Sequence, residues 1–156
     1  LCFSIFMILL IMTLVFRSVT GGLLATLPMV ASVIMMFGLM GYLDIPLNMT
    51  TSMLTGIMVG VGVDYTVHFL WHLRDHIKSG DSLDDAIATT LRISGKGILF
   101  NGLSVIIGFS ALLFSVFVPV QIFGILVMGS ISLCLFGALA TLPALISLIN
   151  PKFLYR

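Results

Sequence analysis

Residues 49–73 read MTTSMLTGIMVGVGVDYTVHFLWHL, a helix-length apolar stretch that contains a single carboxylate, Asp64. A hydrocarbon core about 30 Å thick is crossed by about 20 residues of helix, so this stretch is long enough to span a membrane. An ionised side chain near the bilayer centre costs about 2.5–3.5 kcal/mol, and such residues usually mark an ion path or a proton relay. Asp64 is therefore the first candidate functional residue.

The whole chain is as apolar as this stretch. Hydrophobic residues make up 60% of its 156 residues, and charged residues make up 8%. Because a water-soluble domain contains about 25% charged residues, the composition predicts a membrane protein. The formal net charge of +1 is too small to indicate binding to nucleic acid.

Five stretches have the length and composition of membrane-spanning helices, and the predicted fold class is an all-α, polytopic transmembrane bundle. The chain is treated as one domain, 1–156. Because residue 1 is neither Met nor part of a polar lead-in, we expect a fragment of a longer polypeptide. The predicted spans cover residues 1–16, 22–42, 49–73, 97–117 and 120–149.

A cytoplasmic amphipathic helix is predicted between the third and fourth spans, over about residues 82–94. Ser82 and Asp85 have the spacing of a capping box. Leu83, Ile87 and Leu91 recur every four residues and form an apolar stripe. This helix either lies on the inner membrane surface or is a connector packed on the bundle.

All seven Lys and Arg residues fall in three places along the chain. With five spans, these places share one side of the membrane, and the positive-inside rule assigns that side to the cytoplasm. The N-terminus is then expected outside the cytoplasm and the C-terminus inside it. The basic residues are Arg17, Arg74, Lys78, Arg92, Lys96, Lys152 and Arg156.

A stripe of small residues shares a helix face with Asp64, because residues four apart lie on nearly the same side of a helix. Small residues let helices approach closely in lipid. We therefore expect this face to pack against another helix, with Asp64 facing protein. The predicted packing face comprises Ser52, Gly56, Gly60 and, on the adjoining surface, Gly62.

Reversible protonation is the predicted role of Asp64; the alternative is a structural carboxylate that is hydrogen-bonded to a neighbouring helix. Tyr65 carries a phenol that can donate to the carboxylate or pass on a proton. His68, one turn further, can move protons toward the cytoplasm. Asn101 and Ser104 of the fourth span are candidate relay partners, although polar residues there also serve as packing contacts.

No metal or organic cofactor is expected, and protons are the expected coupling ion. His68, His72 and His76 recur every four residues, but the drift of about 40° per step separates the first from the third. Cys2 and Cys134 form no disulfide or metal pattern. The sequence also lacks a nucleotide-binding loop, HExxH and GxSxG, so we expect no enzyme.

A series of short motifs follows a specific order along nearly the whole chain: Phe16-Arg17-Ser18, Gly41-Tyr42-Leu43-Asp44-Ile45-Pro46-Leu47-Asn48, Gly60-Val61-Gly62-Val63-Asp64-Tyr65, Arg74, Gly108-Phe109, Phe123-Gly124 and Leu142-Pro143-Ala144-Leu145. Together they resemble the resistance-nodulation-division (RND) superfamily. The resemblance is greatest to its MMPL-like and hydrophobe/amphiphile exporter branch, which is related to the sterol-sensing domains.

The resemblance implies a transporter of twelve helices in two halves, each interrupted by an extracytoplasmic porter domain, with this chain similar to helices eight to twelve. It implies that Asp64 and Tyr65 match the tenth-helix pair, which works with a similar pair on the fourth helix to couple proton entry to export of lipids or other hydrophobic molecules. At Ser104 the family often has threonine. A prokaryotic inner membrane is the implied location.

The partners implied are membrane lipids, a hydrophobic or lipid substrate, and the first transmembrane half and porter domains of the same transporter. A homo-oligomer is a further candidate assembly. Two rival functions fit the same residues. A sterol- or lipid-sensing bundle would act without a proton gradient, and an assembly subunit would hold Asp64 in a permanent pair with a basic residue of a partner.

Overall fold

The computed structural model describes residues 2–16 and 18–149, and all regular elements in these ranges are helical. A 3-10 turn, η1 (Ala111–Phe114), follows α4, and a π-helical segment, η2 (Gly137–Thr141), joins α5 to α6. The predicted all-α class is confirmed. The α-helices are α1 (Cys2–Phe16), α2 (Val19–Tyr42), α3 (Met49–Lys78), α4 (Leu83–Ser110), α5 (Val118–Phe136) and α6 (Leu142–Ile149).

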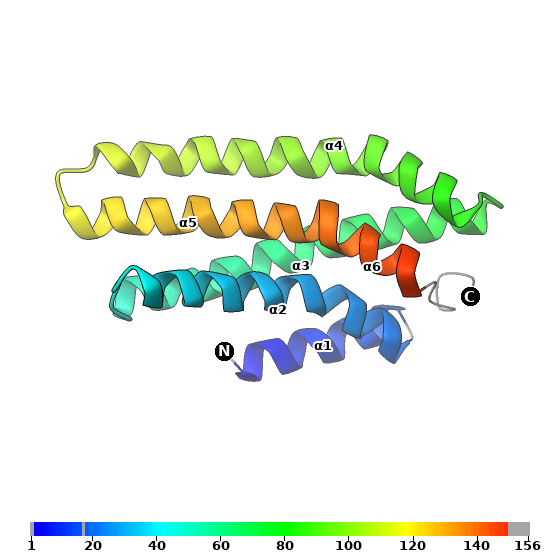
Figure 1. The fold of residues 1–156 in the computed structure, drawn as a ribbon, viewed down its shortest axis with the longest axis horizontal. Helices are drawn as coiled ribbons and strands as arrows, with labels where there is room; N and C mark the ends of the chain where they lie inside the picture. The colour runs from blue at the N-terminus through cyan, green and yellow to red at the C-terminus, as the bar shows by residue number, and fades with distance from the viewer. Residues whose placement is uncertain (1, 17, 150–156) are drawn as a thin grey trace.

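Four helical segments of the described ranges are long and apolar enough to cross a membrane, and α1 is a shorter apolar helix of 15 residues. The long helices run side by side along the long axis of the molecule (Figure 1), which confirms the helical bundle. The four segments are Val19–Tyr42, Thr51–Lys78, Leu83–Phe114 and Val118–Ile149.

The helix ends gather at two opposite ends of the bundle (Figure 1). The α2–α3 and α4–α5 connections lie at one end. The end of α1, the start of α2, the α3–α4 turn and the end of α6 lie at the other. We call the latter the basic end, because Arg74 and Lys78 occupy the last turns of α3 and Arg92 and Lys96 the first half of α4. Arg17, Lys152 and Arg156 lie outside the described residues.

The helix predicted over 82–94 is not separate from the fourth span, because α4 is one continuous helix of 28 residues. Its first turns pack on the bundle through the half-buried Leu83, Ile87 and Leu91, as expected for a connector helix. A helix of this length is about 42 Å long, so it extends beyond a hydrocarbon core about 30 Å thick.

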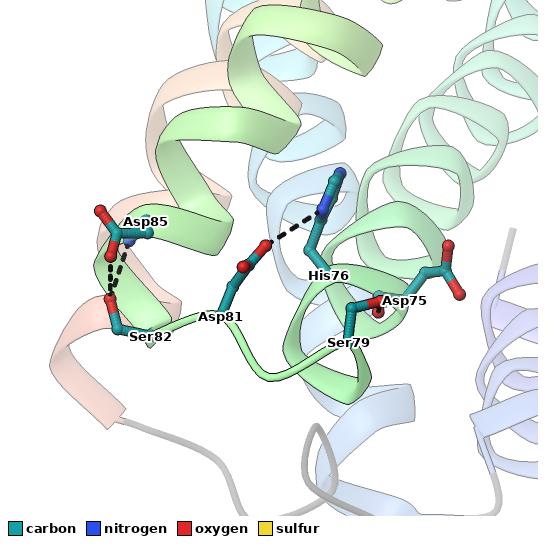
Figure 2. A network of polar contacts seen from close by, with 6 residues as sticks. All are labelled: Asp75, His76, Ser79, Asp81, Ser82 and Asp85. Carbon is teal, nitrogen blue, oxygen red and sulfur yellow. Dashed lines mark hydrogen bonds and ion pairs between the residues drawn. The ribbon is translucent and has the colours of Figure 1, made fainter.

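Local hydrogen bonds define the α3–α4 turn at the basic end (Figure 2). Ser82 is the N-cap of α4: its Oγ accepts a bond of 3.3 Å from the Asp85 backbone N–H and donates one of 2.6 Å to Asp85 Oδ2. The N-cap is therefore confirmed, but the Asp85 carboxylate bonds to the Ser82 hydroxyl in place of the Ser82 backbone N–H, so the capping box is incomplete. His76 Nδ1 lies 3.3 Å from Asp81 Oδ2. Gly80 has a φ of +99°, a conformation that favours glycine.

The start of α3 is capped by a box that the sequence analysis did not identify. Asn48 Oδ1 accepts a bond of 2.9 Å from the Thr51 backbone N–H, and Thr51 Oγ1 accepts one of 2.8 Å from the Asn48 N–H. These bonds satisfy donors that the first turn of a helix leaves unpaired. They fix where α3 leaves the α2–α3 connection and hence the depth of Asp64.

Candidate functional site

Asp64 lies near the midpoint of α3, and its side chain is 58% exposed within this chain. We expected Asp64 to pack against a neighbouring helix, but no helix of the described residues covers this side chain. Ser52, Gly56 and Gly60 are exposed on the same face. A Cβ atom added at Gly56 or Gly60 would meet nothing within 4 Å.

Gly62 is the one member of the predicted packing face that is packed among the described residues. Its added Cβ would lie 2.9 Å from Met29 Cγ and 3.5 Å from Cys134 Sγ. Because two residues advance a helix by about 200°, Gly62 and Asp64 point in nearly opposite directions. The opposite faces of α3 thus differ: one is packed into the core of the bundle, and the other is open.

Beside Asp64 lies a cavity of about 260 Å³, which we call the α3–α4 groove. It brings together four of the predicted site residues, Asp64, Tyr65, His68 and Asn101. The complete lining is Asp64, Tyr65, His68 and His72 from α3 and Ser94, Gly97, Ile98 and Asn101 from α4.

His68 lies one helical turn from Asp64 along α3. Its Nε2 lies 3.6 Å from Asp64 Oδ1, and both side chains are more than half exposed. This separation is longer than a hydrogen bond, but one water molecule can bridge such a pair. The structure thus places His68 beside Asp64, and its role in moving protons toward the cytoplasm stays a prediction.

Tyr65 is only 2% exposed, and it lines the same groove. Its hydroxyl is buried and has no hydrogen-bond partner among the described residues. The Oγ of Ser94 is likewise buried and unpaired there. Ser94 was not among the predicted site residues, although it lies seven residues before Asn101 and two helical turns place the two on one face.

Ser104 is not brought to Asp64. It does not line the groove, and its Oγ donates a bond of 2.8 Å to the Phe100 carbonyl of its own helix. A serine that bonds back to the preceding turn is a common arrangement inside helices. Of the predicted relay partners, Asn101 and His68 line the groove with Asp64, whereas Ser104 does not.

The three histidines diverge along α3. His68 and His72 line the groove, whereas His76 pairs with Asp81 at the α3–α4 turn. Within residues 2–16 and 18–149, no three His, Cys, Asp or Glu side chains are grouped to hold a metal ion. The groove lining combines carboxylate, imidazole, hydroxyl and amide groups with the apolar Ile98 and with Gly97.

Comparison with known proteins identifies relatives of this chain. Residues 1–154 match the family model of the MMPL family. A curated relative from Methanocaldococcus jannaschii, named as a putative membrane protein, is 32% identical over 139 residues. The match covers 89% of this chain and 36% of the relative, so the chain spans about a third of that protein's length. No solved structure matches the chain.

Proposed function

The chain belongs to the MMPL family, and from this premise we propose that it is the C-terminal transmembrane half of a proton-driven, RND-type exporter of lipids or other hydrophobic molecules. The position of Asp64 carries the proposal. This carboxylate lies near the midpoint of a membrane-length helix and opens on the α3–α4 groove, and its neighbour in the chain, Tyr65, lines the same groove and has a buried hydroxyl. Intramembrane acids in such surroundings are typical of proton relays.

Protonation of Asp64 provides a means of coupling. The ionised carboxylate is costly to place against apolar surface, whereas the neutral acid is tolerated there. Gain of a proton therefore favours closure of another helix on the open face of Ser52, Gly56 and Gly60, and loss of the proton favours opening. The first transmembrane half of the same transporter is the proposed partner, and its movement transmits the change to the porter domains.

A lipid-sensing domain without transport is the second candidate, and one observation favours it. A wholly apolar cavity of about 330 Å³ is lined by α1 and the first residue of α2. Its surface is suited to an acyl chain or a sterol. Such a domain would bind lipid with or without a proton gradient, whereas export depends on the gradient. The cavity is lined by Phe6, Leu9, Leu10, Thr13, Leu14 and Val19.

The test compares Asp64→Asn with Asp75→Asn in the full-length protein. Asp75 is an exposed acid on the same helix near the basic end, so the control makes the same chemical change. Cells that express the wild type should accumulate less Nile red than cells without it, and a protonophore should remove the difference. Asp64→Asn should abolish the efflux, because an amide cannot release a proton at this site, and Asp75→Asn should retain it.

Gradient-dependent efflux that persists in Asp64→Asn contradicts the proposal. Lipid binding without gradient-dependent efflux in the wild type supports the sensing function instead. Equal membrane insertion of the two variants, measured by the yield of folded protein, ensures that loss of efflux reports on coupling.

A further inference from the structure

We propose that α3, where it reaches the basic end of the bundle, binds the headgroup of an anionic phospholipid such as phosphatidylglycerol. The site is a cavity of about 150 Å³, which we call the α3 end pocket. It shares no residue with the α3–α4 groove. The proposal does not rest on the proposed function, because a headgroup binds whether or not protons move. The pocket is lined by Trp71, Arg74, Asp75 and Lys78.

The α3 end pocket lies on an exposed side of the helix. Its four lining residues follow the spacing i, i+3, i+4 and i+7, so they share one helix face. On the other side of α3, Phe69 and Leu73 are fully buried in the core. Figure 2 shows Asp75 directed away from His76 and from α4. Since Trp71 is 58% exposed, the pocket is open to molecules outside the described chain.

The depth of the pocket matches the boundary between acyl chains and headgroups. Asp64 lies near the midpoint of α3, and half of a hydrocarbon core about 30 Å thick is about 15 Å. At 1.5 Å per residue, Arg74 lies about 15 Å from Asp64 along the helix and Lys78 about 21 Å. Trp71, about 10 Å from Asp64, lies near the interface at which tryptophan is enriched. The two cations therefore lie at the level of lipid phosphates.

Arg74 carries donors that the described residues leave unused. Its Nε is buried without a hydrogen-bond partner, and neither Arg74 nor Lys78 forms an ion pair with a described residue. A buried N–H without an acceptor is costly, so an acceptor from elsewhere stabilises this arrangement. A guanidinium presents its donors in a fixed fork that matches phosphate oxygens. Lys78, one turn further on, adds a second positive charge.

The charge of the pocket indicates the class of headgroup. Two cations and the carboxylate of Asp75 give a formal net charge of +1. Phosphatidylglycerol carries a single negative charge, and its glycerol hydroxyls can donate to a carboxylate. Phosphatidylethanolamine carries an ammonium as well and is neutral overall. A volume equal to about five water molecules of about 30 Å³ each has room for a phosphodiester group.

The pocket is separate from the face on which the first transmembrane half is proposed to close. Gly60 precedes Trp71 by eleven residues, which is about 16 Å along α3. A helix can therefore pack on Ser52, Gly56 and Gly60 while the end of α3 stays in contact with lipid.

Arg92 and Lys96 provide a matched control. They lie one turn apart on α4, both are exposed, and neither lines the pocket. Neither forms an ion pair within the part of the chain that the structure describes. Replacement of both by glutamine removes the same charge from the basic end as the same change at Arg74 and Lys78.

The experiment identifies the molecule that contacts position 71 in the full-length protein. Photoreactive benzoylphenylalanine replaces Trp71, and the protein is reconstituted in vesicles of equal parts phosphatidylglycerol and phosphatidylethanolamine with identical acyl chains. After illumination, mass spectrometry should find about ten phosphatidylglycerol adducts for each phosphatidylethanolamine adduct, because two basic residues attract the anionic headgroup. The same photoreactive residue at Ile107, which is 70% exposed on α4, should form both adducts equally.

The charge variants test the residues that hold the headgroup. Arg74→Gln combined with Lys78→Gln should bring the adduct ratio at position 71 close to one. Arg92→Gln combined with Lys96→Gln should leave the ratio unchanged. Excess inorganic phosphate should also leave it unchanged, because the free ion lacks the acyl chains that hold a lipid in the bilayer.

An adduct ratio near one at position 71 overturns the proposal, as does a ratio that Arg74→Gln with Lys78→Gln leaves unchanged. A cross-link to a peptide of the first transmembrane half shows that this half covers the pocket and also overturns it. Loss of the phosphatidylglycerol adduct in excess inorganic phosphate assigns the pocket to the free anion instead.

Native mass spectrometry of the full-length protein with Trp71 in place gives a second measurement that needs no photoreactive residue. The wild type should retain more phosphatidylglycerol than phosphatidylethanolamine, and only the Arg74→Gln, Lys78→Gln variant should lose this preference. Equal retention of the two lipids by the wild type, or an equal loss in both charge variants, contradicts a site at the end of α3.

Discussion

At the residue scale, the ring and the hydroxyl of Tyr65 have different surroundings, so a structural role and a role in proton transfer can be tested separately. Its ring is buried in the core, but its hydroxyl bonds to no described residue. Tyr65→Phe therefore removes no hydrogen bond to a described residue, and we expect the free energy of unfolding to change by less than about 1 kcal/mol. Gradient-driven Nile red efflux should fall, because the hydroxyl beside Asp64 is lost. The control Tyr42→Phe, at a side chain 86% exposed, should alter neither quantity.

A large loss of stability in Tyr65→Phe, measured by thermal denaturation of the full-length protein, would show that the hydroxyl has a structural partner. Unchanged efflux would remove Tyr65 from the relay. The variant thus tests the hydroxyl alone, since the ring and its packing are kept.

At the element scale, α4 begins at the α3–α4 turn, where a local cap defines its first residue. Ser82 Oγ accepts from the Asp85 backbone N–H, and replacement of such a cap by alanine costs about 0.5–2 kcal/mol. We expect Ser82→Ala to speed amide hydrogen exchange in the first turns of α4, while the membrane-embedded half of the helix stays protected. Ser132→Ala is the control, because the Oγ of this exposed serine donates to the Met128 carbonyl within α5 and does not cap a helix.

Exchange that accelerates equally along all of α4 in Ser82→Ala would contradict this local role. It would also show that the first turns and the embedded half unfold together. The matched serine in α5 excludes a general effect of removing a hydroxyl from a helix.

At the scale of the whole molecule, the two ends of the bundle lie on opposite sides of the membrane, and we propose that the basic end is cytoplasmic. Ser79 lies in the exposed α3–α4 turn, and the fully exposed Val116 lies in the α4–α5 connection. In intact cells, a membrane-impermeant thiol reagent should label Val116→Cys in the full-length protein at once. Ser79→Cys should be labelled only after the membrane is permeabilised. The reverse pattern would invert the proposed orientation.

Sequence alone determined the properties that depend on local chemistry. Apolar stretches of membrane-spanning length predict helices because a helix pairs its own backbone groups in lipid. The Ser82–Asp85 cap was also predictable, because its bonds join residues that are only three apart in the chain. Asp64 and Tyr65 were identified because an acid in an apolar helix is costly and therefore rare.

Only the tertiary structure decided which helix faces are covered. The spacing of Ser52, Gly56 and Gly60 shows that they share a face, but close packing also requires a neighbour, and the neighbours of α3 pack on the side of Gly62 instead. In the same way, the position of α4 beside α3 decides that Ser94 lines the groove and that Ser104 does not. Periodicity is a property of one helix, whereas burial depends on where the other helices lie.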